Sequence, residues 1–156
     1  MIDQLSKILP DIKFTPGEQF CWSPSDQTIT YAPDQIEADG RWALLHETGH
    51  AILGHKTYKT DYELVRLEVE AWEKAKELAA SLGLTISEDH VQQCLDSYRD
   101  WLHRRSTCPT CGTKTIQKDT SSAYSCFNCH AVWQVSSSRF CRAYRKGQPK
   151  PQNVLL

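Results

Sequence analysis

The chain of 156 residues lacks several features that mark whole classes of proteins. It has no apolar run near the ~20 residues needed to span a bilayer, which argues against a membrane-spanning helix. Its first residues hold no basic leader, no continuous apolar stretch and no small-residue cleavage site, so we expect no secretory signal peptide. No internal repeat is visible. A hydrophobic content of 40% is typical of a folded globular protein, and we expect a cytoplasmic location.

Acidic residues are scarce in the last third of the chain. Residues 101–156 contain nine Lys and Arg but one Asp or Glu, which gives a charge of +8. Residues 1–100 contain nine Lys and Arg against 18 Asp and Glu, which gives −9. This asymmetry predicts two units, the basic one suited to nucleic acid or to an acidic protein. A solvated tail without a partner would have the same composition.

One five-residue motif carries the main chemical signal. Residues 46–50 read HETGH, an instance of HExxH, inside a helix predicted over residues 39–54. Residues four apart share a helix face, so His46 and His50 could bind one zinc ion with Glu47 beside it as general base. An ordinary surface helix with two histidines and a glutamate is the alternative.

A catalytic zinc usually has three protein ligands and one open position. In a second helix, predicted at about residues 61–82, Glu68 falls inside the apolar arc. The other acidic side chains of that helix fall on its polar side: Glu63, Glu70, Glu73 and Glu77. A buried carboxylate is costly unless it is paired or binds a metal, which makes Glu68 the predicted third ligand and Glu70 the runner-up. A carboxylate at the edge of the apolar stripe is the alternative. His55 would point away from the metal on a continuing helix, and we expect it to end the first helix and interact favourably with the helix dipole.

Four of the seven cysteines form the pattern CxxC-x14-CxxC, which is typical of a four-thiolate zinc site: Cys108, Cys111, Cys126 and Cys129. The polar, turn-rich segment between the pairs and the strand-like residues 131–135 predict a zinc ribbon. A closed site of this kind has a structural or recognition role. His130 stands beside the last ligand as an alternative donor. The remaining cysteines follow no ligand spacing and are expected to be small apolar residues or bystanders: Cys21, Cys94 and Cys141.

Together these patterns predict an α+β protein with two zinc ions, one catalytic and one structural. We expect a zincin-type metallopeptidase domain over residues 1–104, a ribbon over 105–142 and a basic flexible tail over 143–156. A β-hairpin at residues 20–31 belongs to the first domain, and its edge could hold an extended peptide. A further helix begins at Ser87 and carries apolar side chains at helical spacing: Val91, Leu95, Tyr98 and Leu102.

Residues 41–55 (RWALLHETGHAILGH) resemble the HExxH helix of the ImmA/IrrE-type metallopeptidases, and residues 68–75 (EVEAWEKA) resemble that family's second helix. The similarity covers about residues 20–82. This family belongs to the gluzincins, so the resemblance implies zinc ligands His46, His50 and Glu68 with Glu47 as base. Two positions depart from the family's pattern: Trp72 stands where a small polar residue is usual, and Lys74 where an aromatic is usual.

The function we expect is that of a small cytoplasmic zinc endopeptidase whose ribbon docks a protein substrate or DNA. HExxH followed by a ribbon also resembles the SprT-like proteases of DNA-associated proteins, although those use a third histidine downstream. A non-catalytic nucleic-acid or transcription-associated module is the third hypothesis. Four side chains could stabilise the oxyanion: Tyr31, Tyr58, Tyr62 and His90.

The surroundings of the ribbon are basic and suit phosphate contacts through Arg104, Arg105, Lys114, Lys118, Arg139, Arg142, Arg145 and Lys146. Aromatic side chains near them could stack on bases: Trp133, Tyr124 and Phe140. Of these we expect Trp133 to pack in the core.

Overall fold

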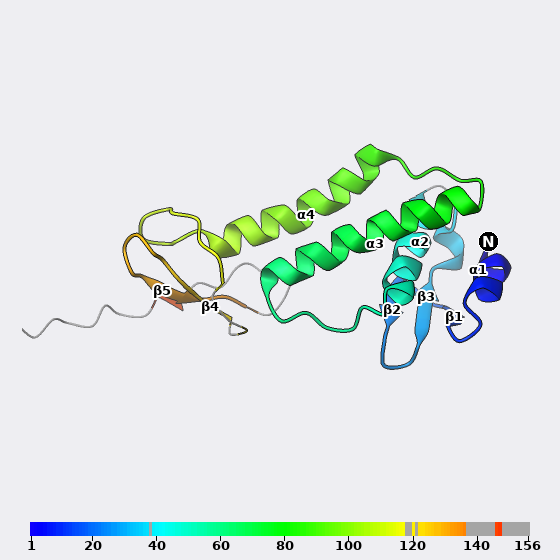
Figure 1. Ribbon diagram of the computed structural model, residues 1–156, viewed down its shortest axis with the longest axis horizontal. Helices are drawn as coiled ribbons and strands as arrows, with labels where there is room; N and C mark the ends of the chain where they lie inside the picture. The colour runs from blue at the N-terminus through cyan, green and yellow to red at the C-terminus, as the bar shows by residue number, and fades with distance from the viewer. Residues whose placement is uncertain (38, 118–119, 121, 137–145, 148–156) are drawn as a thin grey trace, which may run out of the picture. The chain divides into compact units, whose positions relative to one another are not determined.

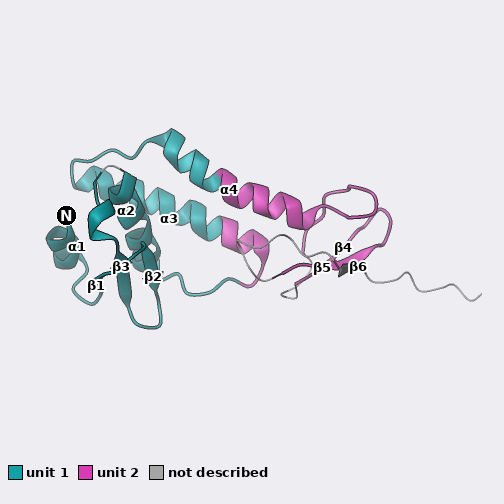
Figure 2. Ribbon diagram, turned by 180° about the vertical axis from the view of Figure 1, so that it is seen from behind, with its two compact units in different colours: residues 1–58, 66–95 teal, residues 59–65, 96–156 magenta. Residues whose placement is uncertain are grey.

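The computed structural model describes residues 1–156 except 38, 118–119, 121, 137–145 and 148–156 (Figure 1). The described part is α+β, with four α-helices and two three-stranded sheets. It divides into two compact units: unit 1, residues 1–58 and 66–95, and unit 2, residues 59–65 and 96–156 (Figure 2). The predicted domain boundaries at residues 104 and 142 concern independent folding and stay predictions. No helix in the described ranges is both long enough and apolar enough to cross a membrane.

Unit 1 contains a small sheet formed by β1 (Lys13–Pro16), β2 (Cys21–Ser23) and β3 (Thr28–Tyr31). β2 and β3 pair antiparallel, which confirms the predicted hairpin. β1 pairs parallel to β3 and was not predicted. The strand order is β1-β3-β2, which leaves β2 at an edge of the sheet. Ile29 is fully buried between two half-buried threonines, as alternation on a one-sided sheet requires.

Three long helices follow, and all three were predicted: α2 (Asp39–Ile52), α3 (Asp61–Ser81) and α4 (Glu88–Ser106). A short α1 (Ile2–Ile8) precedes the sheet, and a 3-10 turn, η1 (Pro33–Gln35), precedes α2. The hydroxyl of Thr60 caps α3 by accepting the N–H of Glu63 at 3.2 Å. The helix is terminated by Gly83, whose φ of +71° lets the N–H of Leu84 reach back to the carbonyl of Ala79 at 2.8 Å.

The core of unit 1 joins the sheet to the apolar faces of the helices, with α2 packed on β2 and β3. Four side chains at its centre are fully buried: Leu5, Ile29, Leu44 and Leu45. α3 and the segment that follows it contribute Trp72, Ala75, Leu78, Ala79, Ile86, Val91 and Leu95. The predicted apolar arc of α3 is therefore the face that packs in this core.

Unit 2 contains the second sheet, with strands in the order β4 (Ala123–Ser125), β5 (Val132–Gln134) and β6 (Lys146–Gly147). β5 is the strand expected within residues 131–135. β6 lies in the segment that was predicted as a flexible tail, and its two residues pair with β5. An open edge of β5 offers the unpaired backbone groups that make such pairing favourable.

A buried ion pair connects the first turn of α3 to the last turn of α4 inside unit 2. The Nε of Arg105 donates to Oδ2 of Asp61 at 2.7 Å, and its Nη2 approaches Oδ1 at 3.3 Å. The hydroxyl of Tyr124 donates to the same Oδ2 at 2.5 Å, and the indole N–H of Trp133 donates to the carbonyl of Arg105 at 2.9 Å. Burial and the charge of Asp61 raise the pKa of Tyr124, which keeps this donor protonated. The network thus anchors the second sheet to both helices.

We predict that Arg105→Ala strongly destabilises unit 2, because it leaves the Asp61 carboxylate buried without its cation. Breaking such a pair from one side costs roughly 3–5 kcal/mol. Arg104→Ala is the matched control, since its side chain is exposed and its loss should change stability by less than about 0.5 kcal/mol. Urea unfolding of the metal-loaded protein measures both, and equal losses in the two variants would contradict the role given to the ion pair.

Candidate metal centres

The HETGH motif lies in the last two turns of α2, where it places both histidine rings on one face. His46 is buried and His50 is half-buried. Their Nε2 atoms face each other at 3.1 Å. Two ring nitrogens at this distance repel each other unless a proton or a metal ion lies between their lone pairs. The pair is therefore half of a possible ligand set.

Glu68 of α3 completes the set. Its Oε2 lies 3.2 Å from Nε2 of His46 and 3.8 Å from Nε2 of His50, and the residue is 6% exposed. Burial works to raise the pKa of Glu68, but hydrogen bonds from the two imidazoles outweigh it and hold that pKa below its ordinary value. The sequence predicted Glu68 on the apolar face of α3, and this is the face that meets the two histidines.

Close contact between α2 and α3 makes this meeting possible. A Cβ added to Gly49 would lie 2.5 Å from the carbonyl oxygen of Ala71, which no side chain tolerates. Glycine at this position of the HETGH motif therefore lets the two backbones touch. Ala71 follows Glu68 by three residues on the same helix face, so the close approach sets how far the carboxylate can reach.

The three donor atoms fit a single metal ion. Atoms bound tetrahedrally at roughly 2.0–2.1 Å from one ion lie about 3.4 Å apart. The observed separations of 3.1, 3.2 and 3.8 Å bracket that value. His46, His50 and Glu68 could accordingly hold a metal ion, and three donors leave room for a fourth ligand from outside the protein.

Glu47, the candidate base, is half-buried one residue after His46. Its Oε2 accepts the backbone N–H of Trp22 at 2.8 Å. No hydrogen bond to its other carboxylate oxygen is found among the described residues. Burial and the charge of Glu47 raise the pKa of the neighbouring Cys21 thiol, so the thiol stays protonated. Because the outward N–H at the middle of β2 is taken by Glu47, this edge strand orients the base, and a peptide paired there would have to displace it.

His55 and Glu70, the two alternative candidates for the third ligand, lie behind His50. His55 follows the end of α2, as expected, and Nδ1 of its ring lies 2.8 Å from Nδ1 of His50, a contact that was not predicted. Glu70 is 40% exposed at its side chain and contacts Arg66 at 2.9 Å and His55 at 3.5 Å. Burial and the neighbouring His50 lower the pKa of His55, although Glu70 opposes this. Neither residue shares the donor set.

Sequence reasoning missed the aromatic support of the site. Trp72 stacks on the ring of His46 with centroids 4.3 Å apart, and His90 meets Trp72 edge-on at 5.6 Å. Nδ1 of His46 is buried with no hydrogen-bond partner among the described residues, so stacking holds this ring in place. Trp72 follows Glu68 by four residues, and that spacing was the available signal.

The four residues expected to stabilise an oxyanion do not lie together. His90 contacts Trp72, Tyr31 packs on the core of unit 1, and Tyr58 and Tyr62 are exposed.

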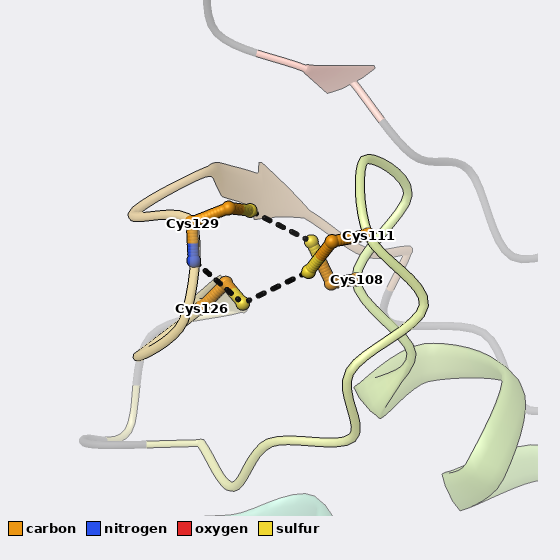
Figure 3. Close-up of side chains that lie close together, drawn as sticks. All are labelled: Cys108, Cys111, Cys126 and Cys129. Carbon is orange, nitrogen blue, oxygen red and sulfur yellow. Dashed lines mark hydrogen bonds between the residues drawn. The ribbon is translucent and has the colours of Figure 1, made fainter.

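The four cysteines of unit 2 converge from two loops, as Figure 3 shows. Sγ of Cys108 lies 3.5 Å from Sγ of Cys129, and Sγ of Cys111 lies 3.6 Å from Sγ of Cys126. These distances exclude disulfides and approach the ~3.8 Å between thiolates on one tetrahedral ion. This four-cysteine cluster could hold a metal ion with four protein donors, which closes the site to further ligands.

Each CxxC pair forms the same turn. The N–H of Gly112 donates to the carbonyl of Cys108, and the N–H of His130 donates to that of Cys126, both at 3.0 Å. Gly112 and His130 occupy the same left-handed position, with φ of +74° and +58°. His130 is exposed and outside the donor set, so it shapes its turn. Hydrogen bonds from Thr113 and Asn128 lower the pKa of Cys111 to about 5, which favours its thiolate.

Some of the basic and aromatic side chains expected to contact nucleic acid are buried, and others are exposed. Arg105 is 3% exposed and paired with Asp61, so its assignment as a phosphate contact is wrong. Trp133 packs in a buried cluster, as expected, and Tyr124 is buried and stacked on it, so neither side chain is available to stack on bases. Arg104 and Lys114 are exposed. Several named residues lie outside the described ranges: Lys118, Arg139, Phe140, Cys141, Arg142 and Arg145.

We predict two metal ions per chain in protein purified with zinc, measured by mass spectrometry of the metal content. Glu68→Ala should lose one ion, because the two histidines alone bind weakly, and Cys108→Ser should lose the other. Glu70→Ala is the matched control on the same helix and should retain both at saturating metal. Equal loss from Glu68→Ala and Glu70→Ala would refute the assignment of the third ligand.

Comparison with protein-family models, curated proteins and solved structures finds no match to this chain. The zincin-type fold and the resemblance to ImmA/IrrE-type enzymes stay predictions, and the geometry of the two centres carries the functional argument.

Proposed function

We propose that the protein is a zinc-dependent endopeptidase that hydrolyses a peptide bond in a cytoplasmic protein. The observation that carries this proposal is the convergence of His46, His50 and Glu68 beside a tethered Glu47. Two neutral imidazoles and one carboxylate are the protein ligands of a hydrolytic zinc site, which keeps one position open. The four-cysteine cluster lacks such a position and serves as the structural zinc site.

The donor chemistry fits zinc in both centres. Imidazole nitrogen and thiolate sulfur donors in tetrahedral sets favour Zn²⁺, whereas Mg²⁺ and Ca²⁺ prefer oxygen ligands in larger sets. Zinc in the His46, His50 and Glu68 site would act as a Lewis acid and lower the pKa of water towards ~7. Reduced cysteines at metal spacing agree with the proposed cytoplasmic location.

Glu47 does the proton transfer in this mechanism. One carboxylate oxygen is held by the N–H of Trp22, which fixes the plane of the group, and the other is available to the attacking water. Glu47 accepts the proton from that water and returns it to the departing amine. The oxyanion needs a further donor; of the four candidates, His90 contacts Trp72, which stacks on the ligand His46.

The position of His55 supports a gluzincin-type site, as in the ImmA/IrrE-type enzymes, over a SprT-like one. A SprT-like site needs a third histidine, and the ring of His55 meets Nδ1 of His50 and not the Nε2 side where the donors converge. Glu68 supplies the donor atom that such a histidine would supply. In this proposal the ribbon unit binds the substrate protein or DNA through its basic surface.

Glu47→Gln should lower proteolysis at least ~10²-fold, because the amide cannot accept the proton. The zinc-loaded full chain would be incubated with a peptide library made from a digested proteome, and newly formed N-termini would be counted by mass spectrometry. Metal content should stay at the wild-type value. Glu73→Gln, an exposed carboxylate on α3, is the control and should cleave as the wild type does.

Cleavage retained in Glu47→Gln would exclude this residue as the base. No cleavage by wild-type protein carrying both metals would favour the non-catalytic alternative, a metal-stabilised binding module. Salt-sensitive binding of the full chain to DNA would then decide between nucleic acid and protein as its partner.

A further inference from the structure

The end of α2 is shaped so that His55 returns to His50. Gly54 adopts a φ of +66°, a left-handed conformation that ends the helix. The N–H of His55 then donates to the carbonyl of His50 at 3.0 Å, and its own carbonyl accepts the indole N–H of Trp22 at 2.8 Å. Both are backbone interactions of His55. They fix the chain and leave the ring free to face the second ring nitrogen of His50.

Counting protons along the two rings gives one arrangement. If Nε2 of His50 offers its lone pair to a metal ion, neutral His50 must carry its proton on Nδ1. That proton points to Nδ1 of His55 at 2.8 Å, which must then be the acceptor. Neutral His55 consequently carries its own proton on Nε2. Each ring is left with a single possible tautomer.

The Nε2 proton of His55 meets a negative charge. Oε2 of Glu70 lies 3.5 Å from this nitrogen, an electrostatic contact longer than a normal hydrogen bond. The other oxygen of Glu70 pairs with Arg66 at 2.9 Å, which holds the carboxylate on the helix surface. The side chain of His55 is 10% exposed, so water competes little for its donor and acceptor.

We propose that His55 and Glu70 form a positioning relay that fixes the metal-binding tautomer and the ring orientation of His50. The inference rests on the proposed metal site of His46, His50 and Glu68, and it adds two residues that touch neither the ion nor the substrate. A hydrogen-bond acceptor behind a ligating imidazole increases its basicity and prevents ring rotation. The relay therefore raises the affinity of the site for its ion.

The test is the affinity of the full chain for Zn²⁺, measured by competition with a chromophoric chelator. Removing an outer partner of a ligating histidine costs ~10–100-fold in metal affinity, and His55→Ala should fall in that range at the His/Glu site. The four-cysteine cluster provides an internal reference and should be unchanged. His55→Asn should retain most of the wild-type affinity, because its amide oxygen can stand where Nδ1 accepts the proton.

Glu70 acts only through His55 in this proposal, so the two substitutions should not add. Glu70→Ala should weaken binding by a smaller factor than His55→Ala, and the double variant should match His55→Ala. Glu73→Ala, one turn along α3 and exposed, is the matched control. Thermal unfolding of the metal-free variants should be close to wild type, since the backbone contacts of His55 remain.

Four results would overturn the relay while leaving the proposed protease intact: unchanged affinity in His55→Ala, equal loss in His55→Asn, additive losses, or destabilisation of the metal-free protein without a change in affinity. Failure of the unsubstituted protein to bind a metal at the His/Glu site would overturn both proposals. The wild-type titration thus separates the two cases.

Discussion

A carboxylate buried on the apolar face of α3 constrains the rest of unit 1. Glu68 lies among the side chains that pack α3 into the core, where an unpaired charge would be strongly unfavourable. Compensation comes from the two imidazoles of α2, and they reach it only because Gly49 lets the backbones touch. The packing of α2 on α3 and the arrangement of the three donor residues thus depend on each other. A larger residue at position 49 would separate the helices and move the Glu68 carboxylate away from the histidines.

Sequence alone predicted the parts of the protein that depend on local spacing. The position of Glu68 on the apolar face of α3 follows from spacing within one helix, and the four-cysteine cluster follows from spacing within two turns. The predicted hairpin and the three long helices are present in the structure. Contacts between distant segments were predicted where a shared metal ion was expected to join them, and the other long-range contacts were missed. Arg105 was assigned to phosphate contacts, since nothing local in the sequence indicates its partner Asp61, which lies 44 residues earlier in the chain. His55 was expected to end the helix, which the left-handed Gly54 confirms, but the contact of its ring with His50 was not predicted.

The two centres differ in the one respect that decides whether a metal can do chemistry. The cluster in unit 2 consists of four cysteines, and each CxxC pair is held by its own backbone turn. A metal ion bound by all four would have no coordination position left for a substrate. The His/Glu set has three donors and a carboxylate beside it whose second oxygen is unengaged among the described residues. In the proposed function, hydrolysis therefore takes place at the His/Glu site of unit 1, and the four-cysteine cluster has a structural role.

Trp22 shows why the small sheet belongs to the site and is not merely attached to it. Its backbone N–H donates to the carboxylate of Glu47, the candidate base, and its indole N–H donates to the carbonyl of His55. One residue on an edge strand thereby orients the Glu47 carboxylate and the segment behind His50. Since the first of these bonds comes from the backbone, substitution of the Trp22 side chain would leave the Glu47 carboxylate tethered and release His55 alone. The orientation of Glu47 depends instead on the register of β2 against β3, so a slip of the hairpin by one residue would turn the N–H inward and free the carboxylate.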